Sequence, residues 1–143
     1  MLFVYIILFF VLGVSAFTDI RYRKIAGNIL GVTAILLIAV LWWLGVLTMK
    51  RLLGASFICG IFLGISVVTG EKIGIGDALL FGVVGLAVGL QRNIAIIMIS
   101  FSIAFLIALF LFVSRKGDRN TEIPLAPILL FSTALTLWNQ PIQ

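Results

Sequence analysis

The sequence has no histidine, a single cysteine and few charged side chains. Without histidine, it cannot build a Ser–His or Cys–His catalytic pair or a histidine-ligated metal site. Cys59 alone can form neither an internal disulfide nor a cysteine cluster for a metal, and its place in an apolar run indicates a small buried apolar residue. Any chemistry must therefore come from other side chains, and we expect neither a metal nor a cofactor.

Charged residues make up only 10% of the chain, whereas soluble domains contain about 25%. Hydrophobic residues make up 63%, and the mean hydropathy is +1.32, so the expected solvent is lipid. The net charge of +5 does not indicate nucleic-acid binding, because the basic residues are dispersed between apolar runs, as in membrane loops. The chain is therefore predicted to be a multi-pass membrane protein in contact with lipid.

The charged residues divide the chain into about six apolar segments, each near the length that a bilayer requires. Open strands cannot satisfy their backbone in lipid, so we expect an all-α membrane bundle of about six transmembrane helices. The predicted segments are Leu2–Thr18, Ala26–Leu47, Leu52–Thr69, Asp77–Leu90, Ile94–Ser114 and Ile123–Trp138. The fourth and sixth are short for full spans. The longest polar stretch, from Ser114 to Glu122, is too short for a soluble domain, so residues 1–143 are expected to form one membrane domain.

Basic residues are unevenly divided between the predicted loops. The first, third and fifth loops carry seven of them, whereas the second and fourth carry three, namely Lys50, Arg51 and Arg92. Because basic loops tend to stay in the cytoplasm, this division places the odd-numbered loops there and both termini outside. We therefore expect the chain to lie in the cytoplasmic (inner) membrane.

Two of the five acidic residues lie at the ends of apolar segments. Asp19 follows the first segment and Asp77 begins the fourth, so the predicted topology brings both carboxylates to the cytoplasmic face. Acidic side chains at such depth are costly and indicate a function. Asp118 and Glu122, in contrast, lie among basic residues in a polar stretch, which is typical of a solvated loop.

Two carboxylates held close together cannot both ionise easily, so they share a proton. One can then activate water as a base while the other donates a proton to a carbonyl, as in aspartic proteases. Gly70, Gly74 and Gly76 precede Asp77 and would let the backbone bend and an extended substrate approach. N–H groups at the helix start could also stabilise ionised Asp77. Asp19 and Asp77 are therefore the candidate catalytic pair.

Each aspartate also has a purely structural interpretation. Asp is a common N-cap, and Asp19 could cap turns beside Arg21. Two other functions also stay open. The same acids could be the proton sites of a small proton-coupled transporter, although the sequence shows no convincing internal repeat of the kind that transporters often have. Alternatively, the chain could be a non-catalytic assembly subunit.

Three stretches together resemble the type IV prepilin peptidases, which belong to the GxGD intramembrane aspartyl proteases. "FTDIRYRKI" resembles the first aspartate box of that family, with an Asp at a helix end followed by a basic loop. "GEKIGIGDALLFGVVGLAVG" resembles the second box, with Gly74, Gly76 and Asp77 as its GxGD motif. "IPLAPILLFSTAL" resembles the late, proline-containing segment of the family and the Pro-Ala-Leu motif of the related presenilins. The resemblance spans nearly the whole chain.

The resemblance implies an aspartic endopeptidase that cuts the short basic leader from prepilin-like precursors at the cytoplasmic membrane face, with Asp19 and Asp77 as catalytic residues. It implies partners in small pilus or secretion-like systems and leaves the oligomeric state open. The family often has Pro-Asn where this sequence has Ala26 and Gly27, and a Lys where it has Leu79, so substrate preference can differ. The family's cysteine-bearing cytoplasmic domain is missing from the sequence, so we do not expect N-methyltransferase activity.

Five further residues are candidates for substrate binding. The acidic one could contact the basic leader of a substrate or form a solvated pair with the neighbouring lysine. The two prolines mark a helix start or shape the cleft. The five are Glu71, Gly74, Gly76, Pro124 and Pro127.

Small residues at helical spacing predict close helix packing in two places. The first set shares one face of the fourth segment, and the second lies in the third segment. They are Ala78, Gly82, Gly85 and Gly89 in the first set, and Gly60 and Gly64 in the second.

Overall fold

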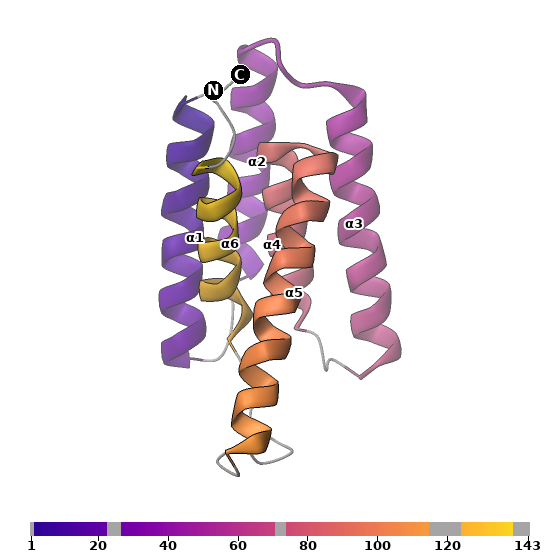
Figure 1. Cartoon of the computed structure of the whole chain (residues 1–143). Helices are drawn as coiled ribbons and strands as arrows, with labels where there is room; N and C mark the ends of the chain where they lie inside the picture. Colours follow the sequence, from indigo (N-terminus) through magenta and orange to yellow (C-terminus); the bar gives the residue numbers. More distant parts are fainter. Residues whose placement is uncertain (1, 23–26, 71–73, 115–123, 139–143) are drawn as a thin grey trace.

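A computed structural model of the chain describes residues 2–22, 27–70, 74–114 and 124–138. These residues form six helices and no strand, which confirms the predicted all-α fold. The helices are α1 (Leu2–Tyr22), α2 (Gly27–Trp43), α3 (Met49–Val68), α4 (Ile75–Val88), α5 (Leu90–Val113) and α6 (Leu125–Trp138). They alternate in direction, so that α1, α3 and α5 finish at the end of the bundle where α4 and α6 begin (Figure 1). Because Asp19 and Asp77 lie there, we call it the aspartate end.

The six helices differ in length in a way that bears on the membrane. The helices α1, α3 and α5 are long and apolar enough to cross a bilayer, whereas α4 and α6 have 14 residues each. At 1.5 Å per residue, a 14-residue helix is about 21 Å long, which is less than the roughly 30 Å of a hydrocarbon core. Accordingly, α5 extends beyond the starts of α4 and α6 at the aspartate end (Figure 1). The short fourth and sixth segments of the sequence thus become short helices inside the bundle.

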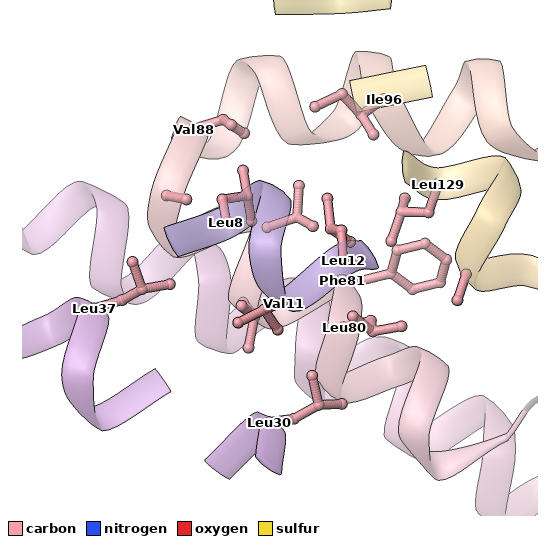
Figure 2. Packing of buried hydrophobic residues seen from close by; sticks show 14 of the residues in the cluster. Leu8, Val11, Leu12, Leu30, Leu37, Leu80, Phe81, Val88, Ile96 and Leu129 are labelled. Carbon is pink, nitrogen blue, oxygen red and sulfur yellow. The ribbon is translucent and has the colours of Figure 1, made fainter. Parts of the chain in front are cut away.

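The core of the bundle is built around α4, which packs against each of the other five helices. Between Ala78 and Val88, every residue except Leu79 is buried. Figure 2 shows side chains of α1, α2, α5 and α6 gathered around this helix. The labelled ones are Leu8, Val11, Leu12, Leu30, Leu37, Leu80, Phe81, Val88, Ile96 and Leu129. In a membrane, where the lipid is as apolar as these side chains, such a bundle would be stabilised mainly by the closeness of their packing.

Two glycines of α4 bring that helix against α3. A Cβ atom on Gly82 would lie 3.1 Å from the Cβ of Cys59, and one on Gly85 would lie 3.3 Å from the Cα of Ala55 and 2.6 Å from Nδ2 of Asn93. Neither position has room for a larger residue. The predicted packing face of α4 is therefore confirmed at these two glycines, and Cys59 is half-buried beside it.

The prediction of a second close-packing pair in α3 is wrong. Gly60 and Gly64 are exposed, and a Cβ atom on either would meet no atom within 4 Å. The physical reason is that α3 presents the opposite face, with Gly54 and Ala55, to its neighbours. Small residues at a spacing of four therefore permit close packing without enforcing it.

The second and fourth predicted loops are shorter than expected, and their basic residues belong to helices. Because α3 begins at Met49 and α5 at Leu90, Lys50, Arg51 and Arg92 lie in first turns. A long basic side chain can lay its apolar stem along a helix end, so such residues do not stop a helix. A single residue, Gly89, separates α4 from α5, and its φ of 86° allows the chain to reverse there.

Candidate active site

Asp19 lies in the last turn of α1. The helix continues to Tyr22, so the expectation that Asp19 ends it is corrected by three residues, because no helix-breaking residue stands between them. The side chain is half-buried. Its Oδ2 atom accepts a hydrogen bond from the backbone N–H of Ala126, at 3.1 Å. This bond joins α1 to α6.

The bond from Ala126 gives Asp19 the position of a helix cap. The first N–H groups of a helix have no partner within the helix, and an oxygen-bearing side chain just before the helix usually accepts one of them. In α6 the preceding residue is Pro124, whose side chain has no acceptor. The carboxylate of Asp19 takes that role from α1. The N-terminal end of the α6 dipole also favours a negative charge at this place.

The helix α4 begins at Ile75, two residues before the predicted start at Asp77. Asp77 is therefore its third residue. It is half-buried, and its carboxylate accepts a hydrogen bond from the backbone of Gly74, the N-cap residue. A side chain at the third helical position that reaches back to the N-cap N–H is one half of a capping box. The interpretation of Asp77 as an N-cap is therefore wrong, because Gly74 is the N-cap and Asp77 supports the helix start from its third position.

The glycine at position 74 leaves room for the Asp77 carboxylate. Gly74 has an extended backbone, with φ −61° and ψ 138°, which any residue can adopt, so its role is steric. A Cβ atom there would lie 3.3 Å from Oδ2 of Asp77, which is closer than such contacts normally are. The absence of a side chain at Gly74 therefore lets the carboxylate lie against the backbone.

The two carboxylates interact electrostatically across the aspartate end of the bundle. One comes from the end of α1 and the other from the start of α4, helices that pack directly against each other. The aspartate end of the bundle therefore carries two carboxyl groups, one from α1 and one from α4, that influence each other electrostatically.

The other candidate residues lie at the starts of the two short helices, except one. Gly76 is the half-buried second residue of α4. Pro124 is exposed directly before α6, and Pro127 is its half-buried third residue, so the prolines do mark a helix start. Glu71 lies outside the described residues. The start of α6 reaches Asp19 through the Ala126 N–H, which brings this part of the proline-containing segment to the candidate site.

Sequence reasoning missed the role of Ala126, because a backbone N–H carries no signature in the sequence. A partial signal was present, since the prolines on either side lack an N–H group and leave Ala126 among few free donors. Three or more cysteine or acidic side chains arranged for a metal do not occur among the described residues.

A second polar cluster, also missed, lies at the opposite end of the bundle. Arg92 donates a hydrogen bond to the hydroxyl of the buried Tyr5 at 3.2 Å, and Asn93 donates one to the Phe81 carbonyl at 2.9 Å. Buried atoms Nη1 of Arg51 and Oδ1 of Asn93 have no hydrogen-bond partner within the described part of the chain. This cluster joins α1, α4 and α5 around the tight connection at Gly89.

Scans of the chain against protein-family models, curated proteins and solved structures give no match.

Proposed function

We propose that this chain is an aspartic endopeptidase of the prepilin peptidase type, with Asp19 and Asp77 as its catalytic pair. The observation that carries the proposal is the meeting of these two residues. They come from distant parts of the sequence, interact electrostatically at one end of the bundle, and are each held by a backbone N–H. A pair that serves only as two separate caps has no need to be brought together, because like charges repel.

The reaction would use the pair as one acid–base unit. The ionised carboxylate takes a proton from a water molecule, whose oxygen attacks the carbonyl carbon of the scissile peptide. The protonated carboxyl donates its proton to the carbonyl oxygen. Collapse of the tetrahedral intermediate breaks the C–N bond: the pair gives its proton to the leaving nitrogen and takes one back from a hydroxyl group of the intermediate, which becomes the new carboxyl group. Water is consumed, two peptides are released, and the pair returns to its starting state with one shared proton.

The substrate class follows from the position of the pair and from the resemblance of the two aspartate boxes. We infer that the aspartate end faces the cytoplasm, since the predicted loops there carry most of the basic residues. The substrate would then be a prepilin-like precursor, whose basic leader is joined to an apolar helix at that face. On the same ground we propose that the chain lies in the cytoplasmic membrane with both termini outside.

The test is cleavage of a pilin-like precursor in membranes, with expression levels matched. Asp19→Asn and Asp77→Asn should each lose nearly all activity, and the double variant should be scarcely worse, because residues that act as one unit are not additive. The controls Asp118→Asn and Glu122→Gln should keep most activity. The pH profile should report apparent pKa values that belong to the pair. A well-expressed Asp77→Asn protein that cleaves at the wild-type rate, or proton-driven flux that depends on the two acids, would favour the transporter instead.

A further inference from the structure

The helix α6 begins with unusually few free N–H groups. An α-helix leaves the N–H groups of its N-cap and of its first three residues without a partner inside the helix. In α6 these four positions hold Pro124, Leu125, Ala126 and Pro127, and proline has no N–H. Only the two middle residues therefore keep a free donor. One of these two, the Ala126 N–H, is bonded to Asp19.

Proline at the third position removes the competing donor for a cap. A capping side chain ordinarily accepts from the N–H of the second or the third helical residue. Of these two usual donors Pro127 removes the one at the third position, which leaves the Ala126 N–H at the second. Ala126 is fully buried, so water cannot easily replace the carboxylate as the acceptor of its N–H. Of the two donors that usually bind a cap, the carboxylate thus has one, and it is buried.

We propose that Pro127 and the Ala126 N–H are positioning groups that hold the Asp19 carboxylate in the orientation in which it meets Asp77. This inference rests on the proposed function, because the orientation of Asp19 affects a rate only if the pair acts on a substrate. Neither group touches the substrate in this role. The proline-containing segment therefore acts on the reaction through Asp19, by removing the second of the two N–H groups that usually bind a cap.

The first test is Pro127→Ala, which restores an N–H at the third position of α6. Alanine fits a helix at least as well as proline does, so stability should be unchanged or higher. The carboxylate can then bind either of two donors, and its position relative to Asp77 is no longer fixed. A misplacement of about 1 Å can cost about 100-fold in rate, so we expect kcat to fall by about 10- to 100-fold at unchanged KM. The pH profile of kcat should also shift, because the donors that hold one member of the pair have changed.

Replacing a backbone amide by an ester removes its N–H and keeps the side chain. Esters therefore separate the effect of the N–H from that of the side chain. Lactic acid at position 127 has the methyl group of alanine but no N–H, so it should restore kcat relative to Pro127→Ala. Lactic acid at position 126 keeps that methyl group but removes the donor to Asp19, so kcat should fall. The matched control is the α-hydroxy acid equivalent of Leu125, which removes the neighbouring N–H that Asp19 does not use and should leave kcat unchanged. The proteins can be made by cell-free translation into lipid nanodiscs.

The outcomes distinguish the inference from the proposed function. If Pro127→Ala and the ester at position 126 both have the kcat and pH profile of the wild type, while Asp19→Asn is inactive, the positioning inference is overturned and the peptidase stands. If Pro127→Ala loses stability and activity together, with an unchanged kcat per folded molecule, the proline has only a structural role. If the wild-type protein cleaves no precursor, both proposals are overturned.

Discussion

Asp19 should stabilise the protein as well as act in catalysis, because its carboxylate caps α6 from a neighbouring helix. Asp19→Ala removes the acceptor of the buried Ala126 N–H, whereas Asp19→Asn keeps a side-chain oxygen that caps a helix about as well as a carboxylate does. Both substitutions abolish the charge and, with it, the proposed activity. Comparing the stabilities of the two variants therefore separates the contribution of the cap from that of the charge.

The expected difference in stability between Asp19→Ala and Asp19→Asn follows from the surroundings of the hydrogen bond between Ala126 and Asp19. Replacing a capping side chain by alanine costs about 0.5–2 kcal/mol, typically about 1. Here the donor residue is fully buried, and an unpaired buried N–H is expensive, so the value should lie in the upper part of that range. Relief of the repulsion with Asp77 is common to both variants and cancels in the comparison. We expect Asp19→Ala to be less stable than Asp19→Asn by about 1–2 kcal/mol.

The measurement is reversible unfolding in mixed micelles with increasing SDS, followed by tryptophan fluorescence. Asp19→Asn should be close to the wild type in stability, because it keeps the cap, and the lost repulsion from Asp77 offsets the lost attraction to the α6 dipole. Equal stabilities of Asp19→Ala and Asp19→Asn would refute the reasoning, since α6 would then not depend on an acceptor from α1. A parallel pair, Asp118→Ala and Asp118→Asn, serves as the control for the general effect of the two substitutions.

Three further predictions concern packing, orientation and scope. Gly85→Ala places a Cβ 2.6 Å from Nδ2 of Asn93 and should cost about 1–3 kcal/mol of stability, whereas Gly60→Ala, in open space, should be neutral or stabilising; comparison of melting temperatures in one detergent decides it. A cysteine at the exposed Lys50 should react with an impermeant thiol reagent in intact cells and one at Lys116 should not, and the reverse pattern would invert the proposed orientation. Mass spectrometry of the cleaved product should show an unmodified new N-terminus, and methylation by the purified chain with a methyl donor would contradict this.

The helical architecture could be predicted from composition and from the spacing of charges. Lipid leaves the backbone almost no alternative to helices, and six apolar runs therefore became six helices. The predicted helix boundaries are less accurate where charged residues were taken to mark the end of a helix. Arg51 and Arg92 lie inside helices, because a long side chain can carry its charge away from the helix that bears it. The short lengths of α4 and α6 were visible in the sequence.

The candidate pair could be found because carboxylates are rare in such a chain, and topology brings two of them to one end. The groups that hold each carboxylate could not be found in the same way. The donor to Asp19 is a backbone N–H more than a hundred positions away, and its direction depends on how α1 and α6 pack. The steric role of Gly74 likewise depends on the rotamer of Asp77. Such contacts are properties of the assembled bundle.

The hydrogen bond between α1 and α6 has a consequence for how the protein matures during synthesis. The helix α4 is short, carries a carboxylate in its first turn, and is enclosed by helices made both before and after it. Asp19 emerges early from the ribosome, but the N–H that holds it arrives only with α6. We expect Asp19 in a nascent chain to lack this hydrogen bond until α6 has been made and has packed against α1. Chains released after α5 should then be inactive in a cleavage assay, so the proposed activity would appear only in molecules that contain α6.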